Sequence, residues 1–416
     1  MNRSQALTYT YSLKRLGKTP GLACIQRVLE QLGNPQENLR VLHVAGTNGK
    51  GSVCAITASI LQAAGYKVGL FTSPFLVSFY ERMQIDSKPI LAEEYACLAT
   101  KVKAITDELG EELSQFAFIT AVAFCYFYEQ NCDVVVLETG LGGRLDATNV
   151  VKKPLATAIT AVGLDHTDLL GDTIEQIAKE KCGILKQNVP VVLSPGQPTQ
   201  VIAVAMERAA NLNCKVILPG ASALTVEEIT PHATRFTYGE KSYALSLHGA
   251  YQPQNAVTAL ELIEASGLRV REQAIQKGLA TAVHPARCQV LRADPLILLD
   301  GAHNPQGATA LAGTLHHFLG DQKALGVCGV MSDKAANGLA DQIAPYLEEV
   351  IGVTPNTPRA LPAIEVAACF AKTCKTQTAV LDKQLLTRLW QETRPVVIFG
   401  SLYLAGEILT LLEESE

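Results

Sequence analysis

Hydrophobic residues over positions 1–200 fall into short continuous runs separated by stretches with helical spacing. Continuous apolar runs are typical of strands buried on both faces, as in a parallel sheet. They predict strands over 40–45, 67–71, 133–138, 155–162 and 189–193. Helical spacing predicts helices over 5–16, 22–31, 53–64, 93–109, 116–130 and 173–185, with Asp172 as the N-cap of the last. Strands alternating with helices indicate βαβ units, and hence a mostly parallel sheet with flanking helices.

The pattern changes twice in the remaining chain. Short alternating runs over 215–247 predict a small antiparallel region, and helices are expected over 254–264 and 271–280. After a boundary near 282–287, five strands and five helices alternate strictly. This second part is expected to be a Rossmann-like, doubly wound α/β domain. The sequence therefore predicts an α/β protein of two domains, 1–284 and 285–416.

Composition narrows the class of protein. The chain has 416 residues, of which 48% are hydrophobic and 18% charged, enough for a sizeable core. Its net charge of −5, with no basic stripe, argues against a nucleic-acid partner. The most apolar stretch, 116–128, is shorter than the ~20 residues that a membrane span needs. Eleven scattered cysteines without a CxxC pair, after a polar opening segment, indicate reduced thiols in a cytoplasmic protein.

The strongest chemical signal is the glycine-rich segment GTNGKGS at 46–52, between a predicted strand and a predicted helix. Glycines allow the backbone to approach a polyanion, and a helix N-terminus presents N–H groups and a positive dipole end. Lys50 adds a charge for β/γ-phosphates, and Ser52 a hydroxyl for phosphate or metal. The usual pattern GxxxxGK followed by Ser or Thr is broken, because position 44 is Val and the hydroxyl lies two places after Lys50. A phosphate-binding loop is still favoured over a simple turn.

Two further strand ends carry candidate metal ligands. Glu138 closes the run VVVLE, and His166 follows the next strand in the segment DHTD. Ligands of open α/β sheets collect at the carboxyl ends of the strands. Glu138 could hold Mg²⁺ or be a surface acid, and the glycine-rich segment 140–146 after it favours a ligand site. For His166, a metal or acid–base role is favoured over a structural one.

Other candidates are weaker on residue type alone. Lys181 sits on a predicted helix, where an ordinary solvated lysine is the simpler interpretation. Asp300 and His303, in DGAHNP, follow a strand of the second predicted domain. Arg287, in the linker, could bridge a phosphate or be a plain surface arginine.

Taken together, these motifs resemble the folylpolyglutamate synthase/dihydrofolate synthase family, relatives of the Mur ligases. The resemblance rests on GTNGKGS, FTSP (71–74), ETGLGGRLDATN (138–149), LDHTDLLGDT (164–173), EKCGI (180–184), QNA (254–256), LDGAHNP (299–305), PRALP (358–362) and GSLYLAGE (400–407). It covers nearly the whole chain. It implies a Mur-ligase-like ATP-binding domain and an ATP-dependent amide ligase. In that chemistry a substrate carboxylate attacks the γ-phosphoryl group of ATP, and L-glutamate's amine then attacks the acyl phosphate.

The resemblance also assigns roles. It implies triphosphate binding by Thr47, Asn48, Gly49, Lys50, Gly51 and Ser52, with nucleotide contacts from Asn255, Arg287, Asp300 and His303. Two Mg²⁺ ions would be held by Ser73, Glu138 and His166. Lys181 matches a lysine that the family carries as a carbamate, which reverses the interpretation from residue type; with Lys50 and His166 it forms the expected catalytic set. The acceptor would be lined by Thr19, Pro20, Phe116, Leu145, Asp146 and Ala147.

Three positions depart from the family pattern. Phe75 replaces a usual His, Ala117 a frequent Glu, and Ala335 a usual Asp. The first two lie near the expected pteridine region and bear on the choice of acceptor. The main hypothesis is glutamate addition to tetrahydrofolate by a monomeric enzyme acting on small molecules. Its alternatives are an enzyme that also or mainly makes dihydrofolate from dihydropteroate, a P-loop NTPase module without ligase activity, and a Mur-type peptidoglycan ligase. The last would need an N-terminal UDP-sugar domain, for which the opening ~40 residues are too short.

Overall fold

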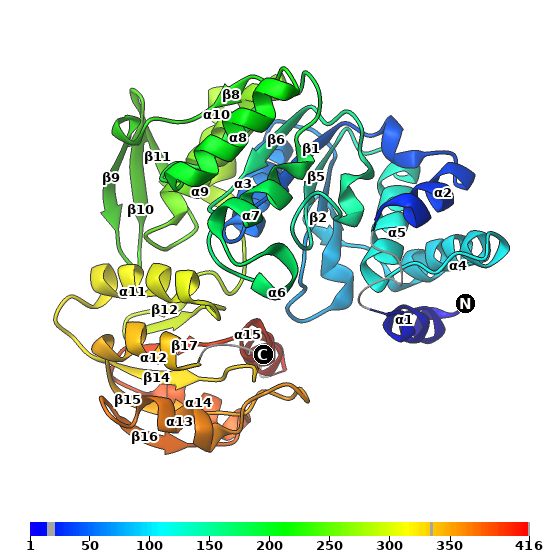
Figure 1. Cartoon of the computed structure of the whole chain (residues 1–416). Helices are drawn as coiled ribbons and strands as arrows, with labels where there is room; N and C mark the ends of the chain where they lie inside the picture. Colours follow the sequence, from blue (N-terminus) through cyan, green and yellow to red (C-terminus); the bar gives the residue numbers. More distant parts are fainter. Residues whose placement is uncertain (15–20, 333–335, 415–416) are drawn as a thin grey trace. The chain divides into compact units, whose positions relative to one another are not determined.

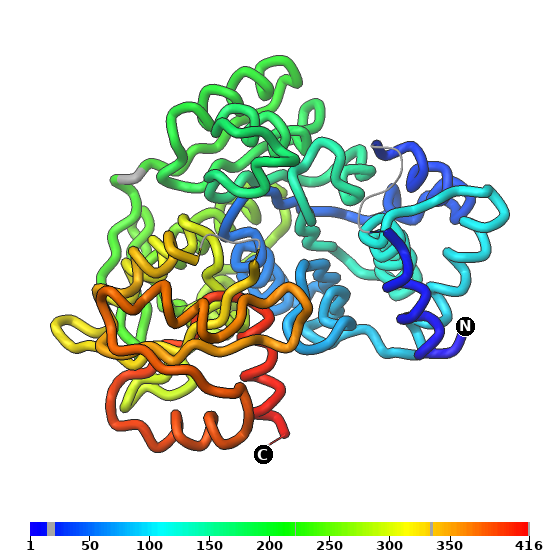
Figure 2. The backbone as a smooth tube through the Cα atoms, turned by 60° about the horizontal axis from the view of Figure 1, so that its bottom comes forward, coloured from blue at the N-terminus to red at the C-terminus, as the bar shows by residue number. Residues whose placement is uncertain are grey.

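The structure is a computed structural model that describes residues 1–14, 21–332 and 336–414. The chain forms two compact units (Figure 1). Unit 1 contains Met1–Ala223 and Gln254–Thr281, and unit 2 contains Leu224–Pro253 and Ala282–Glu416. Residues 224–253, green in the tube of Figure 2, thus group with the C-terminal part of the chain. The predicted division of this chain into domains 1–284 and 285–416 stays a prediction.

Unit 1 is built on one eight-stranded sheet in the order β4-β3-β2-β5-β1-β6-β7-β8. The six strands from β2 to β8 run parallel, and β3 and β4 extend the sheet as an antiparallel hairpin. The strands are β1 (Val41–Ala45), β2 (Val68–Phe71), β3 (Met83–Ile85), β4 (Lys88–Pro89), β5 (Val134–Glu138), β6 (Ala156–Ile159), β7 (Val191–Leu193) and β8 (Val216–Ile217).

Helices surround this sheet, as Figure 1 shows. They are α1 (Arg3–Ser12), α2 (Ala23–Gln31), α3 (Lys50–Ala63), α4 (Ala92–Glu108), α5 (Gln115–Glu129), α6 (Thr167–Leu170), α7 (Ile174–Lys181), α8 (Thr199–Asn211), α9 (Gln252–Ala265, in unit 1 from Gln254) and α10 (Glu272–Thr281). Helix α3 packs on β1, β2 and β5. Helix α5 contains the most apolar stretch of the sequence, in a segment predicted to be helical, and it is buried along nearly its whole length.

Unit 2 holds two sheets. A three-stranded antiparallel sheet, β11-β10-β9, consists of β9 (Leu224–Ile229), β10 (Thr234–Tyr238) and β11 (Lys241–Leu245). The second sheet has the order β12-β13-β17-β14-β15-β16, parallel except at β12. Its strands are β12 (Gln289–Ala293), β13 (Leu296–Leu299), β14 (Ala324–Cys328), β15 (Leu347–Gly352), β16 (Lys375–Thr378) and β17 (Val396–Phe399). Its helices are α11 (Pro305–Leu319), α12 (Ala336–Ile343), α13 (Ala363–Phe370), α14 (Lys383–Gln391) and α15 (Leu402–Glu413).

The predicted α/β class is confirmed: a large, mostly parallel sheet with helices and a second mixed sheet. Several elements were not expected: strands β3 and β4 in a segment interpreted as loop, helices α6 and α8, strand β8 and the edge strand β12. The N-cap of α7 is Thr173 rather than Asp172, because the Thr173 hydroxyl accepts the Gln176 N–H in a capping box. In the described ranges, every helix is too short or too polar to cross a membrane.

Candidate active site

The candidate site of unit 1 lies at the carboxyl ends of four neighbouring strands. In the order β2-β5-β1-β6, these strands lead into the segments that contain Ser73, Glu138, the loop 46–52 and His166. Parallel strands bring their following loops to one sheet edge, which is where ligands bind in open α/β sheets. The topology therefore gathers at one edge the residues that the sequence analysis chose from separate motifs.

The glycine-rich loop is shaped by contacts with the segment after β6. The N–H groups of Thr47 and Asn48 donate to the Ala161 carbonyl oxygen at 2.9 and 3.1 Å. A Cβ on Gly46 would lie 1.8 Å from Thr160 Oγ1, so only glycine fits there. Gly49 has φ +86° and is the N-cap of α3, which begins at Lys50. The loop thus leads directly into a helix N-terminus, the arrangement that binds phosphate.

Two lysines converge on one carbonyl of this loop. Lys50 Nζ donates to the Gly46 oxygen at 3.1 Å, and Lys181 Nζ donates to the same oxygen at 2.7 Å. Lys181 is buried, with 3% of its surface exposed. Burial, and then the neighbouring Lys50 charge, lower the pKa of Lys181 to about 7, against the opposing effects of Asp165 and Asp146. A large fraction of Lys181 is therefore uncharged at neutral pH, unlike the solvated lysine that residue type alone suggests.

Glu138 and Ser73 form an oxygen-rich corner of the site. Glu138 is buried as the last residue of β5, and its Oε2 accepts the Ser73 N–H at 2.9 Å. Carboxylate and hydroxyl oxygens are hard donors of the kind that Mg²⁺ prefers. Across the residues that the structure describes, no group of three or more His, Cys, Asp or Glu side chains is arranged to hold a metal. Glu138 and Ser73 are therefore two residues of this edge that could contribute oxygens to a magnesium site.

His166 is placed differently from Glu138. It precedes the single turn α6 with φ +50°, and its side chain is 49% exposed. Its Nε2 lies 3.9 Å from Asp165 Oδ1, and its N–H donates to that same oxygen at 2.9 Å. Asp165 therefore fixes the backbone at His166, while the imidazole remains accessible.

The segment 139–149 is closed by one buried aspartate. Asp146 Oδ2 accepts the N–H groups of Gly140 and Leu141, both at 2.9 Å. Its Oδ1 accepts the N–H of Thr148 at 3.0 Å and the hydroxyl of the same residue. Burial raises the pKa of Asp146, and these four donors oppose the rise. The Phe116 ring covers this loop, because a Cβ on Gly140 would lie 2.6 Å from it.

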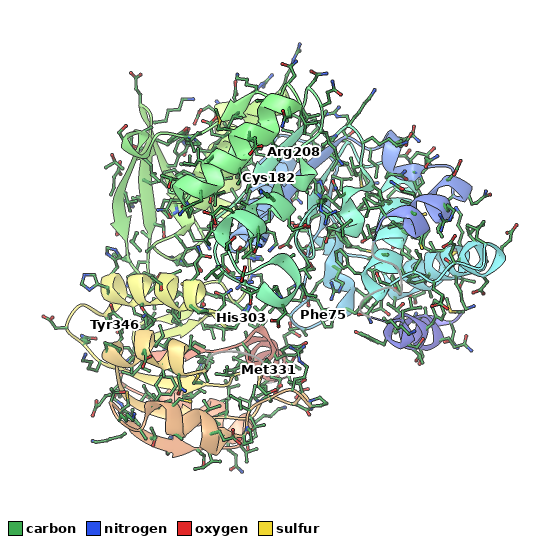
Figure 3. The ribbon with its side chains drawn as sticks, in the orientation of Figure 1. Phe75, Cys182, Arg208, His303, Met331 and Tyr346 are labelled. Carbon is green, nitrogen blue, oxygen red and sulfur yellow. The ribbon has the colours of Figure 1, made fainter. Side chains whose placement is uncertain are left out.

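The same segment is docked closely on the turn that carries Lys181. The Arg144 N–H donates to the Glu180 carbonyl oxygen at 2.7 Å, and the Arg144 guanidinium pairs with the Glu180 carboxylate at 2.9 Å. A Cβ on Gly183 would lie 2.4 Å from Arg144 Cα. Beyond Lys181, η4 (Cys182–Ile184) packs on α8, where Figure 3 labels Cys182 and Arg208. Burial raises the pKa of Cys182 to about 12, so this thiol is unreactive.

Unit 2 has its own strand-end cluster. Asp300 follows β13 and is buried; its Oδ1 accepts the Ala302 N–H and its Oδ2 the Cys288 N–H, each at 2.7 Å. Burial raises the pKa of Asp300, and the Arg287 charge opposes the rise. Ala286 and Cys288, on either side of Arg287, have φ +56° and +48°, a left-handed conformation that is uncommon outside glycine. Asp300 thus holds the turn that presents Arg287.

The remaining predicted residues are located as follows. Asn255, on α9, approaches Gly49 so closely that a Cβ there would lie 2.5 Å from Asn255 Oδ1. His303 Nδ1 is 2.8 Å from the Gly301 carbonyl oxygen. Leu145 is 43% exposed, whereas Ser52 and Ala147 are buried. Thr19, Pro20 and the departure at Ala335 lie outside the described residues.

The sequence analysis missed several residues that organise these loops. Thr160 Oγ1 donates to the Asn48 carbonyl oxygen at 2.7 Å, and Tyr251 Oη lies 3.4 Å from Asp300 Oδ2. His43 and Thr148 are joined by a hydrogen bond beneath the segment 139–149. Thr148 lies inside the motif ETGLGGRLDATN, and His43 is the single polar residue in the apolar strand VLHVA. That interruption was the one available sequence signal for His43.

Comparison with protein families defines the class. A model of the Mur ligase middle domain matches residues 44–263, more than half of the chain. A model of the Mur ligase glutamate ligase domain matches residues 286–402. With a glycine-rich loop at the start of α3 and a second α/β sheet, the chain is an ATP-dependent ligase of the Mur type.

Individual relatives identify the branch. The chain is 35% identical to "Folylpolyglutamate synthase" of Lacticaseibacillus casei and 34% identical to "Dihydrofolate synthase/folylpolyglutamate synthase" of Bacillus subtilis. The first match covers 98% of both chains and the second 97% of both. A structure of "E.coli FolC in complex with DHPP and ADP" superposes with a TM-score of 0.88 at 29% identity, covering 100% of this chain and 98% of that one. The chain belongs to the folylpolyglutamate synthase/dihydrofolate synthase family, which confirms the resemblance seen in the sequence.

Proposed function

We propose that the protein joins the amine of L-glutamate to the carboxylate of a tetrahydrofolate, through an acyl phosphate made with ATP. The observation that carries this proposal is the convergence of two lysine side chains on the glycine-rich loop. Lys50 and Lys181 both donate to the Gly46 carbonyl oxygen, at the sheet edge where Glu138 ends β5. Phosphoryl transfer depends on positioning and charge neutralisation more than on covalent chemistry by the protein. The relatives' names supply the substrate class.

The nucleotide would be bound mainly through backbone and cations. The residues 47–52 would surround the triphosphate at the N-terminus of α3, with Lys50 beside the β/γ-phosphates. Asn255, Arg287, Asp300 and His303 would contact the nucleotide. Asp300 already accepts two backbone N–H groups. We therefore propose that it affects ATP binding mainly by holding Arg287 in place.

Magnesium would be held by Ser73, Glu138 and His166, with two ions as the expected number. The Glu138 carboxylate and the neighbouring Ser73 hydroxyl suit a hard cation. When bound, Mg²⁺ would neutralise phosphate charge. The protein's own contribution would be to orient the Glu138 carboxylate through the hydrogen bond from the Ser73 N–H.

Lys181 would act as a carbamate. An uncharged amine attacks CO₂, forming an N–C bond and releasing one proton, and the product is an anion. The lowered pKa of Lys181, about 7, supplies the uncharged amine at neutral pH. The buried anion would then lie beside Lys50 and help to orient the metal ligands.

The acceptor would bind along Phe116, Leu145, Asp146 and Ala147, with Thr19 and Pro20 from the segment outside the described residues. The names of the relatives include both activities, so an enzyme that also makes dihydrofolate from dihydropteroate is the second candidate. We also propose a cytoplasmic monomer. All eleven cysteines are free in the structure, which is typical of a reducing compartment.

The test is phosphate release from MgATP and L-glutamate with tetrahydrofolate, with dihydropteroate, or with no acceptor. We expect release with tetrahydrofolate only, and release with both acceptors would establish the bifunctional enzyme. Release that is independent of acceptor would overturn the ligase proposal in favour of an NTPase. Glu138→Gln should abolish acceptor-dependent release, whereas Glu108→Gln, at an exposed glutamate of α4, serves as the matched control.

A further inference from the structure

Three buried polar side chains connect the central strand β1 to the segment 139–149. His43, on β1, has no exposed surface, and its Nε2 lies 2.8 Å from Thr148 Oγ1. Thr148, also fully buried, bonds through the same oxygen to Asp146 Oδ1 at 2.5 Å. Asp146 then accepts the N–H groups of Gly140 and Leu141. A continuous chain of hydrogen bonds therefore runs from the sheet to the loop tip.

The direction of each hydrogen bond follows from the number of protons available. An ionised Asp146 carboxylate only accepts, so the single hydroxyl proton of Thr148 points to Asp146. Thr148 Oγ1 must then accept from His43, which requires the proton on Nε2. Burial lowers the pKa of His43 to about 3, so the ring stays neutral and keeps that one N–H. The other ring nitrogen, Nδ1, is then a bare acceptor.

That bare acceptor is unsatisfied. Nδ1 of His43 is buried without a hydrogen-bond partner in the described chain. An unsatisfied buried acceptor is unfavourable, and an apolar side chain would avoid it on a strand whose other residues are all apolar. The favourable contribution of the histidine is therefore its N–H to Thr148. This hydrogen bond fixes the hydroxyl rotor and, through it, the carboxylate that closes the loop.

We propose that His43 is a positioning residue for the acceptor, acting through Thr148 and Asp146 to hold residues 140–146 in their binding conformation. The acceptor part of this proposal rests on the function proposed above. The ordering part does not, because it concerns the loop in the unliganded protein. His43 itself contacts neither phosphate nor metal in this scheme.

Two pairs of variants separate the effect of losing a hydrogen-bond donor from the effect of changing the side-chain volume. Thr148→Ser keeps the hydroxyl, and Thr148→Val keeps the shape without it. His43→Gln keeps an N–H donor, and His43→Leu keeps an apolar volume. We expect Thr148→Val and His43→Leu to raise the KM for tetrahydrofolate about tenfold, with the KM for ATP changed less than twofold. Thr148→Ser and His43→Gln should recover most of that loss.

Amide hydrogen exchange supplies a measurement that needs no turnover. Peptides covering 139–147 should exchange at least tenfold faster in Thr148→Val and His43→Leu, while peptides covering 46–53 stay as in the wild type. Unchanged exchange in 139–147 would overturn the ordering role. Faster exchange with an unchanged acceptor KM, or equal increases in both KM values, would overturn the acceptor role. Wild-type protein without acceptor-dependent turnover would refute the proposed function, and the exchange data would still decide whether His43 orders the loop.

Discussion

Each compact unit carries one buried aspartate that organises a loop after a strand. Asp146 in unit 1 accepts three backbone N–H groups and one hydroxyl, and Asp300 in unit 2 accepts two backbone N–H groups near Tyr251 Oη. Burial raises both pKa values. In both regions, therefore, the oxygens of a buried carboxylate accept hydrogen bonds from nearby residues and so hold a loop in place.

The cations that accompany these carboxylates differ. The charge that opposes the pKa rise of Asp300 is the guanidinium of Arg287. Near Asp146 lies Lys181, which burial makes half neutral near pH 7. The region in unit 2 therefore offers a guanidinium, a group whose planar donors suit phosphate. The region in unit 1 offers a group whose chemistry can change.

The two regions also differ in how closely other atoms pack around a glycine of each turn. In unit 1, Gly183 faces backbone atoms, since a Cβ would lie 2.4 Å from Arg144 Cα. In unit 2, a Cβ on Gly301 would lie 2.3 Å from Leu402 Cδ2, the end of a half-buried side chain that can rotate. The turn that carries Lys181 thus leaves less room for an added side-chain atom than the Asp300 turn. This suits a residue whose function depends on continued desolvation.

The largest expected effect is at Lys181. Lys181→Ala should lower kcat about a hundredfold, because it removes the proposed carbamate anion. Lys181→Glu should recover part of the rate by restoring a negative charge. Lys179→Ala, an exposed lysine on the same helix, is the control. Steady-state phosphate release measures all three, and wild-type rates in both Lys181 variants would rule out the carbamate.

The different packing around Gly183 and Gly301 predicts that an added methyl group lowers the free energy of unfolding by different amounts at the two positions. Gly183→Ala should lower the free energy of unfolding by about 3 kcal/mol, because backbone cannot move aside. Gly301→Ala should lower it by about 1 kcal/mol, because Leu402 can change rotamer. Gly220→Ala, where the nearest atom would be 3.8 Å away, is the neutral control. Urea unfolding of the three variants tests the order, and equal losses at Gly183 and Gly301 would remove the contrast.

The lowered pKa of Lys181 also predicts a pH dependence of stability. Between its native pKa of about 7 and the unfolded value of about 10.4, the unfolded chain binds a proton that the native protein lacks. Stability of the wild type relative to Lys181→Met should therefore rise with pH, by roughly 2 kcal/mol from pH 7 to 9. Urea unfolding in CO₂-free buffer at several pH values measures it. A constant difference would show that Lys181 stays protonated.

A smaller effect is expected at Asp300. Asp300→Asn replaces one of the two acceptor oxygens with an amide that cannot accept, so the turn around Arg287 should loosen. We expect the Kd for ATP to rise about fivefold, with the KM for tetrahydrofolate unchanged. Calorimetric titration with ATP measures this, beside the exposed control Asp321→Asn. If acceptor binding weakened equally, Asp300 would have a general structural role.

The sequence analysis predicted most of the helices and strands correctly, but it predicted few of the contacts between loops. Apolar runs such as 133–138 identify a buried strand because burial on both faces needs a continuous run. The β3–β4 hairpin was missed because its strands are short and one contains Pro89. The burial of Lys181 could not be inferred from residue type, since it depends on the close approach of Gly143 and Gly183 from separate segments. Only the family resemblance pointed to that lysine.

The order of segments along the chain limits where this protein could be divided into separate fragments. Unit 2 begins with residues 224–253, and the chain then returns to unit 1 before entering unit 2 again at Ala282. A fragment starting at 285 would lack Tyr251, which lies beside Asp300, and strand β9, which packs on α11. Recombination between relatives at the 284/285 boundary would therefore combine the turn around Arg287 from one parent with its supporting residues from the other. Exchangeable modules would need two crossover points, one on each side of the segment 224–253, in addition to the one at 282.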